Sequence, residues 1–298
     1  MSALDQCVIY KVAIGSLGTR RKANTGAVTV KAQNGGVDPD RDQVYVAKEI
    51  LDHPRLDAVF KAQQDLRKFL ALRSLPSILE RGHYAVPKPG FKEVRDGVKT
   101  HADKISKKVD EFLLVYETAK SDAKKKLGAL YDSDDYPDPD QIKKAFYVRT
   151  RIRSLGLPED VKSLIGDDAF KEESKVIEED NATADEELTL HMRTQYLEYS
   201  SRLVDRLSPD ENGKPKVFHD TLISNLTNYH AFFPQKNVTS DVILKQLVEK
   251  GTLALDGIEA ADLRGSNALR VKTLAVFNPI VKELTSILPK NGRKVVLD

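Results

Sequence analysis

The 298-residue sequence contains a single cysteine, Cys7, and no apolar run long enough to cross a membrane. One cysteine cannot form an internal disulfide or supply the clustered thiolates of a zinc or iron–sulfur centre. Because Cys7 lies at the start of an apolar segment, we expect it to be a small core residue. Met1–Asp5 lacks the charged and then apolar pattern of a secretion signal. These features predict a cytoplasmic protein without a membrane partner.

An excess of charge of one sign is also missing. The 47 Lys and Arg residues oppose 45 Asp and Glu residues, which leaves a formal net charge of +2. This balance excludes a uniformly basic coat for nucleic acid and a polyacidic tail, so any electrostatic function must come from local patches. The charges are segregated: residues 131–140 are acidic, 141–153 are basic, and 167–187 are acidic again. The last block could repel nucleic acid, mimic it or dock a basic partner, but a solvated helical face explains it best.

Motifs for catalysis and metal binding are sparse. The six histidines form no pair at helical i, i+4 spacing, and no HExxH pattern occurs. The segment Gly15–Arg20 has at best two of the glycines of a dinucleotide loop, so a tight turn is the better interpretation. The acidic segment Asp132–Asp140 lacks the central glycine and terminal glutamate of a calcium loop. The sequence therefore offers no catalytic residue, metal ligand or cofactor site, and we expect a protein that is not an enzyme.

The hydrophobic pattern predicts a mainly α protein with a small N-terminal β element at residues 1–37. Apolar residues alternate over 8–14, which is typical of a strand, and 28–31 is a second extended candidate. The basic stretch 20–22 would lie in the connection of this hairpin. A lone hairpin is only marginally stable in water, so it must pack on helices or extend another sheet.

Residues 38–208 read as a long helical hairpin with further helices. Helices are predicted over about 39–51 and 56–70, and after a Pro- and Gly-containing connector at 81–90 an unbroken 3.6-residue periodicity runs from 91 to 130. A helix of that length is usually paired, and the preceding helix is its expected antiparallel partner. Further helices are predicted at 139–155, with Asp138 as its N-cap, at 158–165, and at 188–207 after a flexible break at 181–183.

The loop Ser208–Pro215 carries the strongest turn signal in the chain and predicts a boundary there. Residues 209–298 would then form a C-terminal helical subdomain. Its helices are expected at 217–232, at 240–250 with Ser240 as N-cap and Gly251 as C-cap, and at 265–288 with a kink at Pro279. Residues 295–297 could form a short strand.

Two basic patches are the candidate sites for nucleic acid: Arg20, Arg21 and Lys22, and then Lys143, Lys144, Arg149, Arg151 and Arg153. Phe146 and Tyr147 interrupt the second patch, and aromatic side chains can stack on bases while cations neutralise phosphates. On the predicted helix, however, Arg149 and Arg153 fall nearly opposite Lys143, Lys144 and Arg151. A solvated or salt-bridged helix is therefore the favoured interpretation here. The run Lys124–Lys126 is a third patch that is typical of a solubility surface.

Two phrases suggest a relationship with a known family. They are Ser16-Leu17-Gly18-Thr19-Arg20-Arg21-Lys22 after the first strand, and Arg81-Gly82-His83-Tyr84-Ala85-Val86-Pro87 leading into the long helix, which ends in Leu130-Tyr131-Asp132. Over about residues 6–160 the chain resembles an uncharacterised family of helical bacterial and phage proteins. Its members tend to be encoded beside MoxR-type AAA+ ATPases and von Willebrand factor A-domain proteins. The loop at 23–37 is longer here than in that pattern.

The resemblance carries no catalytic residues and implies a partner-dependent accessory role in a bacterial host. The leading expectation is thus a non-enzymatic interaction or scaffold protein of a phage or mobile-element system. It would work with other proteins, either an AAA+ ATPase or further copies of itself. The alternative is a nucleic-acid-binding protein that uses the two basic patches.

Overall fold

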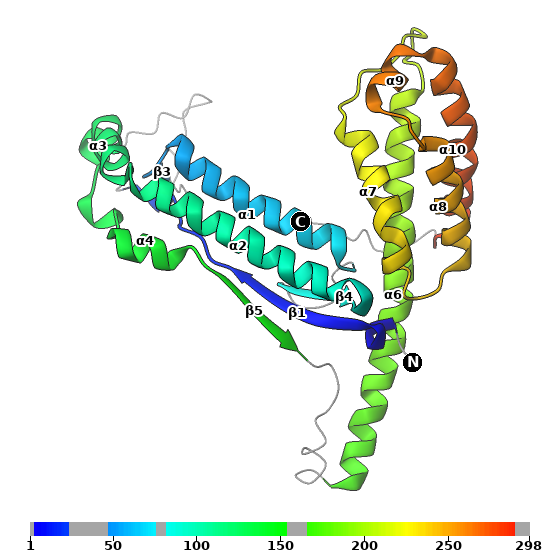
Figure 1. Ribbon diagram of the computed structural model, residues 1–298, viewed down its shortest axis with the longest axis horizontal. Helices are drawn as coiled ribbons and strands as arrows, with labels where there is room; N and C mark the ends of the chain where they lie inside the picture. Colours follow the sequence, from blue (N-terminus) through cyan, green and yellow to red (C-terminus); the bar gives the residue numbers. More distant parts are fainter. Residues whose placement is uncertain (1–2, 24–46, 76–81, 154–165, 290–298) are drawn as a thin grey trace, which may run out of the picture. The chain divides into compact units, whose positions relative to one another are not determined.

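The computed structural model describes residues 3–23, 47–75, 82–153 and 166–289 (Figure 1). The prediction of a mainly α fold is confirmed. The helices are α1 (Pro54–Arg73), α2 (Phe91–Leu113), α3 (Tyr116–Leu127), α4 (Pro139–Ala145), α6 (Asp167–Leu207), α7 (Thr221–Lys236), α8 (Val242–Leu255), α9 (Ala260–Gly265) and α10 (Asn267–Ile287). The strands are β1 (Cys7–Ile14), β2 (Arg20–Lys22), β3 (Ala47–Glu49), β4 (His83–Pro87) and β5 (Val148–Arg153).

The chain divides into two compact units, each assembled from segments that are distant in sequence. The first comprises residues 1–11, 70–94 and 152–298, and the second comprises residues 12–69 and 95–151. The predicted boundary loop, Ser208–Pro215, lies inside the first unit, where Pro209 and Pro215 form an isolated antiparallel bridge.

Two small sheets are present, and their pairing differs from the predicted hairpin. The larger has the strand order β4-β1-β5, with β1 and β4 antiparallel in the register Ile9 to Ala85. Its strand β4 occupies the segment that was predicted to be a connector. Three of its residues, Ala85, Val86 and Pro87, are buried. The candidate strand at 28–31 lies outside the described residues. The smaller sheet pairs β2 with β3, so Ala47–Glu49 are extended rather than helical as predicted, and most of the expected helix at 39–51 also falls outside the described residues.

Helices α1 and α2 form the antiparallel hairpin that the sequence predicts, and they lie side by side in Figure 1. Arg55 at the start of α1 donates to the Glu111 carbonyl near the end of α2 (3.0 Å), and Asp65 pairs with Lys104 (3.3 Å). Phe69 lies against Gly97, where a Cβ atom would collide with its ring. The glycine that looked like a weak point in the periodic pattern therefore permits close packing of the hairpin.

The single helix predicted from 91 to 130 is interrupted. Val115 has φ −115° and ψ 5°, outside the helical region, and it separates α2 from α3. Apolar periodicity did not reveal the break because Phe112 and Tyr116 remain buried at a helical spacing on either side of it, with ring centroids 5.9 Å apart. Leu114, beside the break, is left 81% exposed.

In the first unit, helices α6, α7, α8 and α10 pack as a bundle around one apolar core. The flexible break predicted at 181–183 is absent, since α6 continues through it for 41 residues. The three expected C-terminal helices exist, but α8 begins after Asp241 rather than Ser240 and passes through Gly251, the predicted C-cap. Packing accounts for the glycine at this helical position, because the Tyr196 hydroxyl and the His230 ring occupy the space that a side chain would need.

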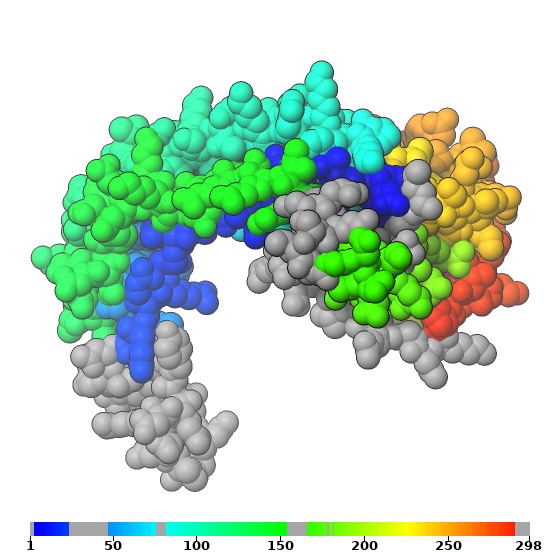
Figure 2. All heavy atoms as spheres, turned by 90° about the horizontal axis from the view of Figure 1, so that it is seen from below, coloured from blue at the N-terminus to red at the C-terminus, as the bar shows by residue number. Residues whose placement is uncertain are grey.

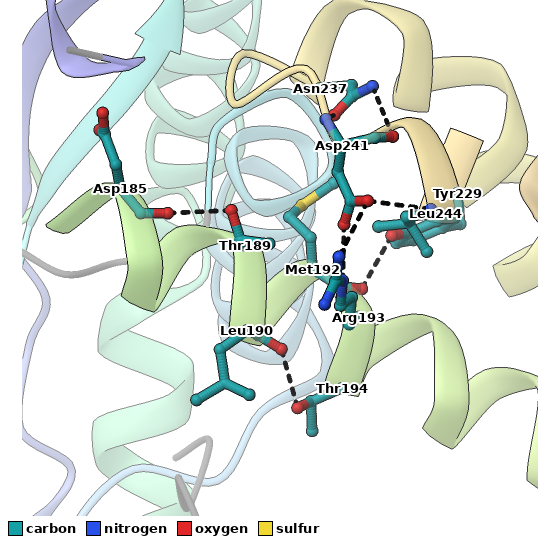
Figure 3. Close-up of polar contacts among 10 residues, drawn as sticks. All are labelled: Asp185, Thr189, Leu190, Met192, Arg193, Thr194, Tyr229, Asn237, Asp241 and Leu244. Atoms are coloured by element: carbon teal, nitrogen blue, oxygen red, sulfur yellow. Dashed lines mark hydrogen bonds and ion pairs between the residues drawn. The ribbon is translucent and has the colours of Figure 1, made fainter. Parts of the chain in front are cut away.

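A partly buried ion pair joins the start of α8 to α6. Figure 3 shows Arg193 and Asp241 pointing toward each other, with Arg193 Nε and Nη2 donating to the two carboxylate oxygens at 2.7 and 3.1 Å. Asp241 also caps α8 by accepting from the Leu244 backbone N–H (3.0 Å). Burial would raise the pKa of Asp241, but these hydrogen bonds outweigh it and lower the pKa. The ion pair therefore joins α6 to the first turn of α8 and stabilises the packing of the bundle.

Candidate nucleic-acid interface

The basic block after α4 is a strand, which corrects the predicted helix at 139–155. Helix α4 begins after Asp138, as predicted, with the Asp138 backbone N–H donating to the Gln141 side chain (3.1 Å). It ends at Ala145, because Phe146 takes an extended backbone and buries its ring against Phe60, with centroids 6.2 Å apart. The alternating β-branched residues of β5 then favour a strand: Val148, Thr150 and Ile152.

Strand geometry changes the arrangement of the arginines. Alternate residues of a strand point to the same face, at intervals of about 6.6 Å, so Arg149, Arg151 and Arg153 form one row. All three are exposed, and β5 is at the edge of its sheet. Within the described part of the chain, none of the three guanidinium groups pairs with a carboxylate. The row is therefore available to an external anion. Figure 2 shows the green atoms of α4 and β5 at the surface.

Tyr147 immediately precedes β5, and its ring lies beside Arg149. Tyr147 is 37% exposed, and the Arg149 guanidinium carbon lies 4.3 Å from its ring centroid. Phe146, the adjacent aromatic in the sequence, is instead a core residue with 7% exposure. Of the two aromatics that the sequence interleaves with basic residues, only Tyr147 can contact a ligand.

Lys143 and Lys144 lie on α4 rather than in the arginine row. Lys143 Nζ pairs with Asp110 on α2 at 2.8 Å, and the hydrogen bond and charge of Asp110 raise the pKa of Lys143. Both partners of this pair are exposed, so it contributes little to stability. Lys144 is exposed, without an ion-pair partner in the described part of the chain. The predicted patch thus divides into one lysine in an ion pair, one exposed lysine and three aligned arginines.

The other predicted patch belongs to a separate sheet. Arg20 lies opposite Glu49 in the β2–β3 ladder, while Arg20 and Lys22 are exposed. Arg21 Nη1 donates to the carbonyls of Gly18 and Arg20 (3.0 and 3.1 Å), and its Nε lies 3.9 Å from Asp135. The two predicted patches thus lie on strands of different sheets.

The sequence did not indicate a groove on the bundle between α7 and α8. Its volume is about 760 Å³, and its lining includes Phe233, Lys245 and Glu249. Val242 and Leu253 at its margin are 63% and 79% exposed. A helical amphipathic pattern does not reveal such a surface, because one additional apolar residue beside the buried stripe looks like part of the core.

The buried polar groups of the bundle serve packing. The Tyr196 hydroxyl and His230 Nε2 lie 3.2 Å apart, and burial lowers the pKa of His230 to about 4. Lys236 donates to the Ala71 carbonyl at 3.5 Å, and burial lowers its pKa to about 8.

Cys7 is buried, as predicted, and burial raises the pKa of its thiol to about 12, so it is a poor nucleophile.

Neither metal-ligand geometry in the described ranges nor comparison with known proteins identifies a family or a further site for this chain. Across the described residues, no group of three His, Cys, Asp or Glu side chains could hold a metal ion. No helix among the same residues is long and apolar enough to span a membrane. No protein-family model, curated protein or solved structure matches the chain.

Proposed function

We propose that this chain binds nucleic acid through β5, with Arg149, Arg151 and Arg153 neutralising successive phosphates. The observation that carries the proposal is the row itself: three exposed arginines on one strand face, without a carboxylate partner in the described part of the chain. Guanidinium groups bind phosphate oxygens in bidentate fashion and remain charged at any physiological pH. Because the net charge is only +2, binding depends on this local row rather than on the whole surface.

Charged residues on an edge strand have a second use, since they prevent pairing with another chain. The test therefore removes charge but keeps long polar side chains: Arg149→Gln, Arg151→Gln and Arg153→Gln in one variant. Affinity for a labelled oligonucleotide, measured by fluorescence anisotropy, should fall about thirtyfold in moderate salt. The slope of log K against log[salt] should become shallower by about 2, since each single-strand phosphate contact contributes about 0.7.

The matched control removes three positive charges elsewhere: Lys124→Gln, Lys125→Gln and Lys126→Gln on α3. Two of these lysines already pair with acids, Lys125 with Asp122 and Lys126 with Asp52. Both triple variants have the same net charge, so a purely global electrostatic effect would weaken them equally. Equal losses, or unchanged binding in the β5 variant, would refute the proposal.

The α7–α8 groove favours a second candidate function, the accessory role that the family resemblance implies. A protein partner, either an AAA+ ATPase or another copy of the chain, would bury the exposed Val242 and Leu253. Leu253→Asp should abolish retention of a co-expressed AAA+ ATPase or convert a self-associated form to monomer. Val271→Asp is the control, because Val271 is 59% exposed on α10 and does not line the groove. Identical behaviour of the two variants would exclude the groove.

A further inference from the structure

Tyr147 is held in a fixed position by the end of β1. The Gly15 N–H donates to the Tyr147 carbonyl (2.8 Å), and the Gly15 carbonyl accepts from Gln63 Nε2 (2.7 Å). Gln63 is itself buried, with 1% exposure. Gly15 is therefore fixed on both sides, and the tyrosine backbone is fixed with it.

The ring depends on the absence of a side chain at Gly15. A Cβ atom there would collide with Cδ1 and Cε1 of Tyr147 and would lie 2.6 Å from the Ala145 carbonyl oxygen. One edge of the ring thus rests directly on the backbone at Gly15, just after β1, while the residue as a whole is 37% exposed. An exposed aromatic ring on a rigid support loses little conformational freedom when a planar group stacks on it.

The guanidinium group over the ring can make way for a ligand. Arg149 lies 4.3 Å from the Tyr147 centroid and has no carboxylate partner among the described residues. A stacked base would displace it toward the neighbouring phosphate, or the guanidinium would cover the base on its other side. In both arrangements the cation stays within the row formed with Arg151.

We propose that Tyr147 is a stacking platform for one unpaired nucleobase, and that β5 therefore selects single-stranded over double-stranded nucleic acid. This inference rests on the proposed function of the arginine row. A base inside a duplex already stacks on its neighbours and cannot reach the ring, whereas a single strand presents free base faces and flexible phosphates. The ligand class is a single strand of DNA or RNA, since stacking on an aromatic ring does not depend on the sugar.

The experiment measures affinity for four probes of one sequence: single-stranded DNA, single-stranded RNA, the DNA duplex, and a single strand with abasic sites. The native chain should bind a single strand about tenfold more tightly than the duplex or the abasic strand. Tyr147→Leu should abolish that preference by weakening only the single-strand complexes, about tenfold. Tyr147→Phe, which keeps the ring, should remain within twofold of the native chain.

Gly15→Ala provides a second variant that leaves the ring and all charges in place. It should displace Tyr147 and reduce the single-strand preference as Tyr147→Leu does, while circular dichroism verifies that the helices remain. Equal affinity of the native chain for single strand and duplex, or an unaltered preference in Tyr147→Leu, would overturn the stacking role. If the arginine row still governs binding in that case, only this inference fails. If the glutamine triple variant of β5 binds normally, the proposed function fails as well.

Discussion

Strands β2 and β5 each carry three basic residues, but their local environments differ. In β2, Arg20 faces Glu49 across the ladder, and Arg21 is occupied by two backbone carbonyls and approaches Asp135. In β5, the arginines alternate with Val148, Thr150 and Ile152 at a sheet edge, and none pairs with a carboxylate in the described part of the chain. The two strands carry the same positive charge, but we expect β5 to bind an external anion more readily than β2. Availability of the cations, more than their number, defines a candidate site.

The largest expected difference comes from removing each set of charges in turn. The glutamine triple variant of β5 should lose about thirtyfold in affinity for a single-stranded oligonucleotide. Arg20→Gln, Arg21→Gln and Lys22→Gln in β2 should lose less than about threefold, because Arg21 already has partners and Arg20 lies opposite the acidic Glu49. Titrations at one salt concentration compare the two directly. A similar loss in both variants would mean that long-range charge, rather than the row, drives binding.

A second variant gives β5 a neighbouring acid, as β2 has in Glu49 of β3 opposite Arg20. Arg151→Glu places a carboxylate between Arg149 and Arg153 on the same strand face, where it can pair with either. Affinity should fall about tenfold, against about threefold for Arg151→Ala, because the new acid also neutralises its neighbours. Arg20→Glu in β2 is the charge-matched control and should change affinity about twofold. If Arg151→Glu and Arg151→Ala bind alike, the row does not act as a unit.

Sequence patterns identified the helices of this chain better than its strands. The predicted C-terminal helices correspond to α7, α8 and α10 because each presents a buried stripe, such as Phe277, Ile280 and Leu284 in α10. Strand β4 was not predicted because its partner β1 is about 75 residues away and only the fold unites Ile9 with Ala85. Local pattern is sufficient for an amphipathic helix, whereas sheet partners are set by tertiary contacts.

In the candidate site, too, tertiary contacts that the sequence pattern does not reveal decide the local structure. All five basic residues of the block at 141–153 were identified from sequence, but a helical period was assigned to them, which dispersed the arginines over opposite faces. The helix stops because Phe146 buries its ring against Phe60, a contact between residues far apart in the chain. The support of Tyr147 by Gly15 and Gln63 likewise joins three distant segments. The alternating Val148, Thr150 and Ile152 were the available signal for a strand.

A smaller effect is expected from weakening the internal pairing near β2. Asp135 forms an ion pair with Lys48 at 2.7 Å and also lies near Arg21, and the Lys48 side chain is only 8% exposed. Asp135→Asn would leave a nearly buried ammonium group without its counter-charge, so it should lower the free energy of unfolding by about 1 kcal/mol. Urea denaturation measures this change. Arg149→Gln should leave the free energy of unfolding within about 0.5 kcal/mol of the native value, because Arg149 is exposed and lacks a carboxylate partner among the described residues.

The smallest expected effect concerns Lys143, which has an acidic partner although it belongs to the same block as the arginine row. Asp110 raises the pKa of Lys143, yet the lysine is protonated near pH 7 with or without that partner. Asp110→Asn would therefore free a cation without changing its charge, and affinity for a single strand should rise about twofold at low salt. Stability should be essentially unchanged, since both side chains are exposed. Asp122→Asn, which frees Lys125 on α3, makes the same change in net charge and should leave affinity unaltered. A rise in both variants would attribute the gain to net charge, whereas a rise confined to Asp110→Asn would extend the binding surface from β5 onto α4.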